Sequence, residues 1–108
     1  MQIKLTTTGR VSGRDRIVTL YGWEDGEDLL VVGSWAGRGR DPDWAGNLRA
    51  EPNASVTKSK ETFEVKAHEL SGTARKRAWE LVVERFPMYA TYQRKTTRQI
   101  PVFALKRR

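Results

Sequence analysis

The chain has 108 residues, no cysteine, a single histidine and a net charge of +7 at pH 7. This length accommodates one compact domain, residues 1–108, and leaves too little chain for a second. The lack of cysteine excludes disulfides, thiolate metal sites and a cysteine nucleophile, and His68 alone cannot form a histidine-rich metal centre, so we predict no metal. No apolar run approaches the roughly 20 residues of a membrane span and no signal-peptide core is recognisable, so we expect a cytoplasmic protein.

The first third of the chain predicts three strands. Residues 3–8 and 16–23 are rich in β-branched and aromatic side chains, and residues 9–14 between them have the glycines of a turn. Asp25-Gly26 marks the next turn. Residues 29–34 then predict a third strand, apolar on both faces as in the wall of a barrel.

Three helical segments are predicted in the remaining chain. Asp41-Pro42 has the sequence of an N-cap followed by the first residue of a short helix. A longer helix is expected from its N-cap, Ser71, to Phe86, because its apolar residues recur at helical spacing. A helical turn over residues 88–93 follows.

Three more strands are predicted over residues 54–58, 62–70 and 100–106. Apolar and polar side chains alternate in the second of these, which directs His68 to solvent. Residues 36–40 are too rich in glycine and charge for regular structure. The hairpins are antiparallel and too short for parallel crossovers, so we expect an α+β, mainly β fold: a six-stranded antiparallel β-barrel with two or three short helices.

The excess of positive charge is concentrated near the C-terminus. Residues 88–108 contain six basic side chains and no acidic one. This asymmetry is typical of proteins with an anionic partner, such as nucleic acid, a membrane surface or a phosphorylated small molecule. A basic face that only contacts solvent explains the charge equally well, so composition leaves the partner open.

No residues combine as a nucleophile with its base, a carboxylate pair on one helix face or a phosphate loop. If the protein is an enzyme, a bound cofactor therefore supplies the chemistry. Residues 9–13 with Arg16 could hold phosphate or carboxylate, and residues 34–37 could meet the polar edge of a ligand. Tyr89 and Tyr92 could close the same pocket. An ordinary charged hairpin and half-buried tyrosine packing are the alternatives.

Four motifs occur in the order and at the spacing of a known family. They are Leu5-Thr6-Thr7-Thr8-Gly9-Arg10-x-Ser12-Gly13-x-x-Arg16, Asp41-Pro42-x-Trp44-x-x-Asn47-Leu48-x-Ala50-x-Pro52, Phe86-Pro87-x-Tyr89-x-x-Tyr92-Gln93 and Ile100-Pro101-Val102. Together they resemble the deazaflavin (F420)-dependent nitroreductase family over nearly the whole chain. The resemblance implies a split β-barrel, related to FMN-binding and pyridoxamine-phosphate-oxidase-like proteins, that binds the 8-hydroxy-5-deazaflavin coenzyme F420. It also implies hydride transfer from the reduced coenzyme to a quinone, nitroaromatic or activated alkene.

The same resemblance implies roles for individual residues. Those expected to hold the phosphate and acidic tail of the coenzyme lie in one turn: Arg10, Val11, Ser12, Gly13 and Arg16. Those expected against its ring and side chain are Ser34, Trp35, Ala36 and Gly37, and those lining its channel are Asp43, Trp44 and Asn47. Those expected near the ring and the substrate are Tyr21, Tyr89 and Tyr92, of which the last two, or water, would deliver a proton.

The chain departs from the family pattern at several positions. Val11 and Trp35 stand where relatives commonly have lysine, so two cationic contacts are lost unless other arginines, Arg14, Arg38 and Arg40, replace them. Phe86 stands where some relatives have tyrosine. The chain begins inside the first strand, whereas many relatives have a preceding helix, so we expect a more open substrate pocket.

Two other classes of function stay open. The chain could bind the deazaflavin, FMN or haem without turnover, or it could be a basic nucleic-acid-binding barrel in which Tyr89, Tyr92 and Phe103 stack on bases. No recognised DNA- or RNA-binding motif is present, so we expect no specific nucleic acid. Split barrels of this size expose a sheet face and a cofactor cleft, so we expect a homodimer. The other expected partner is a small-molecule electron acceptor, and peripheral contact with the inner face of the membrane is left open.

Overall fold

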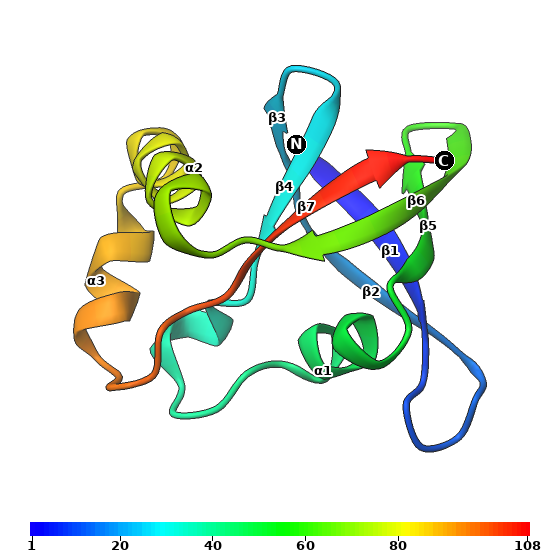
Figure 1. The fold of residues 1–108 in the computed structure, drawn as a ribbon, viewed down its shortest axis with the longest axis horizontal. Helices are drawn as coiled ribbons and strands as arrows, with labels where there is room; N and C mark the ends of the chain where they lie inside the picture. The colour runs from blue at the N-terminus through cyan, green and yellow to red at the C-terminus, as the bar shows by residue number, and fades with distance from the viewer.

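The computed structural model describes residues 1–108 as one curved antiparallel sheet with three helices packed against it (Figure 1). The strands are β1 (Gln2–Thr8), β2 (Asp15–Tyr21), β3 (Trp23–Asp25), β4 (Asp28–Val32), β5 (Asn53–Lys58), β6 (Glu61–Glu69) and β7 (Val102–Arg107). The helices are α1 (Asp43–Ala50), α2 (Gly72–Arg85) and α3 (Met88–Arg94), and one turn of 3-10 helix, η1, spans Trp35–Gly37.

The sheet has seven strands in the order β2-β1-β5-β6-β7-β4-β3. The prediction of six strands was wrong because the strand expected over residues 16–23 is interrupted at Gly22, which divides it into β2 and β3. β2 pairs with β1, with Tyr21 opposite Gln2, whereas β3 pairs with β4 at the other edge. The single buried residue Gly22 therefore joins the strands at the two edges of the sheet. β2 also contacts β4. The sheet is curled into a half-barrel by this joint.

Apolar side chains form two layers, one on each face of the sheet. The first fills the half-barrel and includes Leu29 and Val31, and α1 packs into it through Trp44. The second lies between the sheet and helices α2 and α3, and it includes Leu30 and Val32. The β4 strand is thus apolar on both faces, which confirms the prediction of a barrel-wall strand.

The start of α1 lies one residue later than predicted. Pro42 is the N-cap and Asp43 the first helical residue, and the Ala45 N–H donates to the Pro42 carbonyl at 3.1 Å. The Asp41 carboxylate does not cap the helix because it pairs with two arginines, Arg49 and Arg98. Residues 36–40 also differ from the prediction, since the η1 turn extends into them.

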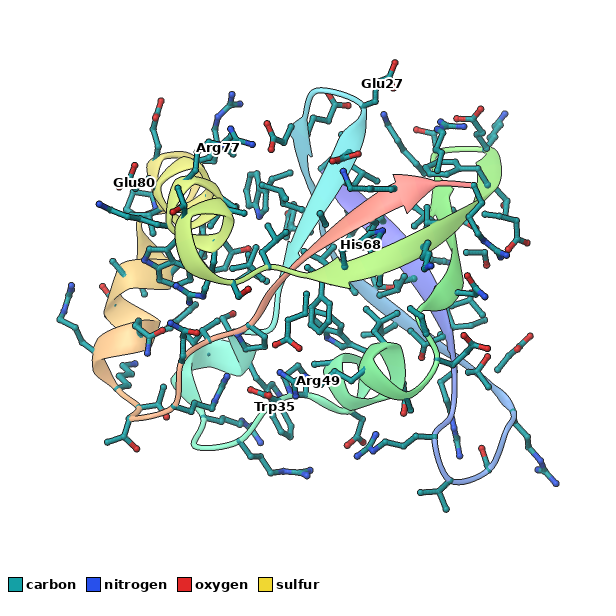
Figure 2. The ribbon with its side chains drawn as sticks, in the orientation of Figure 1. Glu27, Trp35, Arg49, His68, Arg77 and Glu80 are labelled. Carbon is teal, nitrogen blue, oxygen red and sulfur yellow. The ribbon has the colours of Figure 1, made fainter.

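The remaining predicted elements agree with the structure to within two residues at each end. Ser71 is the N-cap of α2, although its hydroxyl makes no capping hydrogen bond. His68 lies on the exposed face of β6, as the alternation predicted (Figure 2). None of the helices combines the length and the apolar character needed to cross a lipid bilayer.

Candidate functional site

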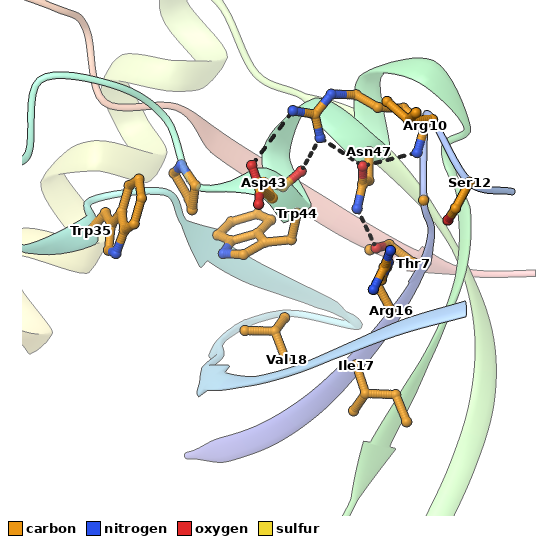
Figure 3. Close-up of a pocket in the computed structure, with 13 residues that line it drawn as sticks. Thr7, Arg10, Ser12, Arg16, Ile17, Val18, Trp35, Asp43, Trp44 and Asn47 are labelled. Atoms are coloured by element: carbon orange, nitrogen blue, oxygen red, sulfur yellow. Dashed lines mark hydrogen bonds and ion pairs between the residues drawn. The ribbon is translucent and has the colours of Figure 1, made fainter. Parts of the chain in front are cut away.

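Two adjoining cavities lie between the β1–β2 turn, β2, η1 and the start of α1. The first has a volume of about 550 Å³ (Figure 3) and the second of about 370 Å³. Four residues line both cavities: Val18, Trp35, Pro42 and Trp44. The cavities therefore form one groove, with the two tryptophans at its middle.

The first cavity has a cationic wall that α1 holds in place. The backbone N–H and Nη1 of Arg10 both donate to Asn47 Oδ1, at 3.1 and 2.8 Å, and Nη1 also donates to the Asp43 carbonyl at 3.1 Å. Asn47 Nδ2 donates in turn to Thr7 Oγ1 at 3.2 Å (Figure 3). The buried Asn47 side chain thus fixes the Arg10 guanidinium relative to β1 and α1.

Arg16, near the start of β2, supplies the uncompensated charge of this cavity. Its guanidinium makes no hydrogen bond or ion pair, whereas that of Arg10 lies 3.5 Å from a carboxylate oxygen of Asp43. The Ser12 side chain lies on the same wall. An unpaired guanidinium near a hydroxyl is a donor set that suits phosphate or carboxylate.

Trp35 brings two further cations to the junction of the cavities. The guanidinium carbons of Arg38 and Arg40 lie 4.8 and 5.0 Å from the centroid of its ring. Contacts of this length between a guanidinium and an indole ring are favourable. Val11, in contrast, lines the first cavity with its side chain 95% exposed and adds no polar contact.

The second cavity is lined mainly by apolar and aromatic side chains. The ring centroids of Phe86 and Tyr89 are 4.9 Å apart, and those of Phe86 and Tyr92 are 6.4 Å apart. Tyr21 contributes to the same cavity from β2. Trp23 Nε1 donates a hydrogen bond of 2.9 Å to the Tyr89 hydroxyl.

The Tyr89 hydroxyl is neutral at physiological pH. Burial raises the pKa of Tyr89 above its ordinary value, and the hydrogen bond from Trp23 opposes this effect only in part. An indole N–H donates but cannot accept, so the Tyr89 O–H proton stays available to another acceptor. The aromatic end of the groove thus contains a buried, protonated phenol.

Most of the predicted site residues lie along the groove. Around the first cavity are Arg10, Val11, Ser12, Arg16, Asp43 and Asn47, around the second are Tyr21, Ser34, Ala36, Tyr89 and Tyr92, and around both are Trp35 and Trp44. Two predicted residues line neither cavity: Gly13 is exposed in the turn, where Gly9 forms the wall instead, and Gly37 is buried. No group of three or more His, Asp and Glu side chains is arranged to hold a metal ion.

Sequence reasoning missed two residues that shape this groove, Trp23 and Arg98. Trp23 was placed only at the end of a strand, and its bond to Tyr89 spans 66 positions of the chain. Arg98 was counted only among the basic residues of the C-terminal segment, although its guanidinium is bonded to the loop that carries Trp35. No local spacing could have signalled either contact.

The basic C-terminal segment is not a free cationic surface. Four of its six cations are ion-paired: Arg98 with Asp41, Lys106 with Asp28, Arg107 with Glu61 and Arg108 with Glu64. The charge asymmetry along the sequence is thus largely balanced in three dimensions. Around the first cavity, in contrast, Arg16 is unpaired and available to a ligand.

Residues 1–107 match the sequence model of a family described as F420H(2)-dependent quinone reductase. The chain belongs to this family. An F420H(2)-dependent quinone reductase of Mycobacterium tuberculosis (strain H37Rv) is 35% identical over 107 residues, which cover 96% of this chain and 72% of that protein. The motifs in the sequence had predicted this relationship, and membership makes the chain an oxidoreductase of the F420-dependent class.

Two solved structures have folds that closely resemble that of this reductase. One, the F420-H2 dependent reductase FDR-A, is 39% identical with a TM-score of 0.88, covering 97% of this chain and 93% of its own. The other, described as a domain-swapped dimer, is 39% identical with a TM-score of 0.89, covering 97% of this chain and 79% of its own.

The groove suits the chemistry of this coenzyme. A deazaflavin coenzyme combines a flat ring with an anionic tail, and the groove has an aromatic end and a cationic end. Arg16 is unpaired, so it can bind the tail without first breaking an ion pair. The ring would lie among the aromatic side chains beyond Trp35 and Trp44.

The η1 turn has a backbone conformation that favours glycine. The φ angles of Trp35, Ala36 and Gly37 are 41°, 53° and 79°, which places three consecutive residues in the left-handed region. A Cβ added to Gly37 would lie 2.8 Å from the Tyr92 carbonyl oxygen. Gly37 therefore lets the turn approach α3 closely behind the groove.

Gly37→Ala should lower the free energy of unfolding by about 1–3 kcal/mol, because it adds both backbone strain and a clash with α3. Urea denaturation measures this change. Gly39→Ala is the matched control, since Gly39 has no positive φ and an added Cβ there would have no atom within 4 Å. Equal destabilisation by the two substitutions would contradict the structural role given to Gly37.

Proposed function

We propose that this reductase transfers a hydride from the reduced deazaflavin coenzyme to a quinone, and that the groove is the site of the reaction. The observation that supports this proposal is the division of the groove into a cationic end and an aromatic end that meet at Trp35 and Trp44. A quinone is flat and largely apolar, as the ring of the coenzyme is. Both would therefore fit the aromatic end.

At the cationic end, Arg16 and Arg10 would bind the anionic tail in different ways. Arg10 is already held by Asn47 and Asp43, so little side-chain entropy is lost when it meets an anion. Arg16 has no partner in the protein and contributes its full hydrogen-bonding capacity. The Ser12 hydroxyl would add a third donor on the same wall.

At the aromatic end, the coenzyme supplies a hydride when it is bound in its reduced form. Reduction of a quinone to a hydroquinone also consumes one proton, so a donor near the acceptor oxygen is required. We assign this donor to Tyr89, whose O–H proton is not used by Trp23, with Tyr92 as a second donor on the same cavity. The aromatic side chains of the second cavity would form the walls around the reacting groups.

We also infer that two copies of the chain associate through β2. This strand is at one edge of the sheet, and its apolar residues Ile17 and Tyr21 are 69% and 56% exposed. An unpaired edge with exposed apolar side chains favours association with another copy. The similar structure described as a domain-swapped dimer supports this inference. The expected cytoplasmic location and peripheral membrane contact stay predictions.

Coenzyme F420 should change its fluorescence on titration with the protein, with micromolar or tighter affinity that weakens as salt is added.

Arg16→Ala should weaken this binding of F420 about tenfold to a hundredfold, because a charged hydrogen bond contributes roughly 1.5–3 kcal/mol. Arg14→Ala is the matched control, since it removes the same charge from the same turn but from a side chain outside the groove. If both variants lose affinity equally, general surface charge explains the binding. A response to FMN with none to F420 would assign the groove to a flavin nucleotide.

Tyr89→Phe should lower kcat for quinone reduction by about 10²-fold or more and leave coenzyme affinity nearly unchanged, because only the proton donor is lost. Trp23→Phe leaves the Tyr89 hydroxyl in place and should retain most of the activity. The raised pKa keeps Tyr89 protonated through neutral pH, so the activity that depends on it should fall only as the pH rises through that raised value. Stopped-flow rates across alkaline pH test both statements, and an unchanged kcat in Tyr89→Phe would exclude the assignment.

Light scattering should give a mass of twice the 12.4 kDa of one chain at micromolar concentration. Ile17→Glu should shift the protein toward monomers, because it places like charges along the proposed interface. Val11→Glu, on an exposed side chain outside the sheet, should not. A mass of one chain for the unsubstituted protein would rule the dimer out.

A further inference from the structure

The loop over residues 33–41 is held in a costly conformation by a side chain from a distant part of the chain. In this loop the backbone of Trp35 and Ala36 is in the left-handed region, a conformation that is uncommon for residues other than glycine. Only two backbone hydrogen bonds lie inside the turn, from the Gly37 and Arg38 N–H groups to the carbonyls of Ser34 and Trp35. The Arg98 guanidinium adds four hydrogen bonds to this loop.

Arg98 bonds to the loop on both sides of the left-handed turn. Before the turn, Nη1 donates to the Gly33 carbonyl at 3.1 Å and Nη2 to the Ser34 carbonyl at 2.8 Å. After the turn, Nε donates to the Arg38 carbonyl at 2.8 Å and Nη1 to Asp41 Oδ1 at 2.7 Å. The Arg98 side chain is only 13% exposed. One guanidinium thus closes the loop from Gly33 to Asp41.

Arg98 is itself fixed by its neighbours. The Gln93 side chain donates to the Arg98 carbonyl at 2.7 Å and accepts from the Ile100 N–H at 3.0 Å, which anchors the segment that presents the guanidinium. Asp41 also accepts from Arg49 of α1, at 2.8 Å, so the loop, α1 and Arg98 share one carboxylate. The loop therefore has little freedom as long as this network is intact.

We propose that Arg98 is a positioning residue of the coenzyme site, which holds Trp35 at the junction of the two cavities and Ala36 on the wall of the second. Arg98 lines neither cavity, so it acts through the loop and does not touch the ligand. The proposal rests on the proposed function, because it takes the groove to be the coenzyme site. A planar guanidinium is needed, since the acceptors surround it in a fork that a lysine ammonium cannot match.

Arg98→Ala should have two effects. Hydrogen exchange of the Gly37 and Arg38 amides should become about tenfold faster or more, and F420 should bind about tenfold to a hundredfold more weakly in the fluorescence titration. Arg98→Lys should recover little of either loss. Guanidinium chloride at millimolar concentration should restore binding to Arg98→Ala, and sodium chloride at the same ionic strength should not.

Two further variants separate positioning from charge and from folding. Arg94→Ala removes the same charge from α3, where the exposed side chain bonds only to Thr91, and should leave both readouts unchanged. Asp41→Asn keeps the shape of the side chain but removes its charge, and should reproduce part of both effects in a folded protein. If Arg98→Ala does not fold, Asp41→Asn tests the positioning role in its place.

The two readouts distinguish failure of this proposal from failure of the proposed function. Unchanged exchange in Arg98→Ala, or faster exchange with unchanged F420 affinity, would overturn the positioning role. If the unsubstituted protein does not bind F420 at all, the proposed function and the coenzyme-positioning role both fail. The exchange data then still decide whether Arg98 holds the loop.

Discussion

A single residue, Gly22, joins the two edges of the sheet, and the position of the groove depends on this joint. Its backbone exchanges two hydrogen bonds with Met1, of 2.8 and 3.0 Å, which hold the bend against the start of β1. Before the bend, β2 runs along the groove and contributes Arg16 and Tyr21. Directly after it, Trp23 reaches Tyr89 on α3. The cationic and aromatic ends of the groove are therefore brought together by one change of edge.

Arginine side chains have two distinct roles in this molecule. Arg98 and Arg49 are bonded to carbonyl and carboxylate oxygens and connect the loop before α1 to α1, β6 and the C-terminal part of the chain. Arg75 likewise donates to the Ile100 carbonyl at 2.6 Å, and burial lowers its pKa. Arg16 remains unpaired at the groove. Net charge therefore says little about where an anion binds, because many of the cations are already paired within the protein.

The sequence was sufficient for the elements whose pattern is local. The alternating and doubly apolar strands, the helix after Ser71 and the glycine-rich turns were predicted correctly because periodicity and turn chemistry depend on neighbouring residues. The predicted N-cap at Asp41 failed because a long-range ion pair with Arg98 competes for its carboxylate. The count of strands failed because the bend at Gly22 is imposed by pairing at two different edges.

The sequence by itself determined the family, the class of coenzyme and most of the residues along the groove, because the four motifs keep their residue types and spacing. Only the tertiary structure decided that Gly13 lies outside the groove, that four of the six C-terminal cations are paired, and that Trp23 donates to Tyr89 and Arg98 to the loop that carries Trp35. These contacts join residues more than 40 positions apart. Their geometry follows from how the half-barrel curls, and no local pattern in the chain encodes it.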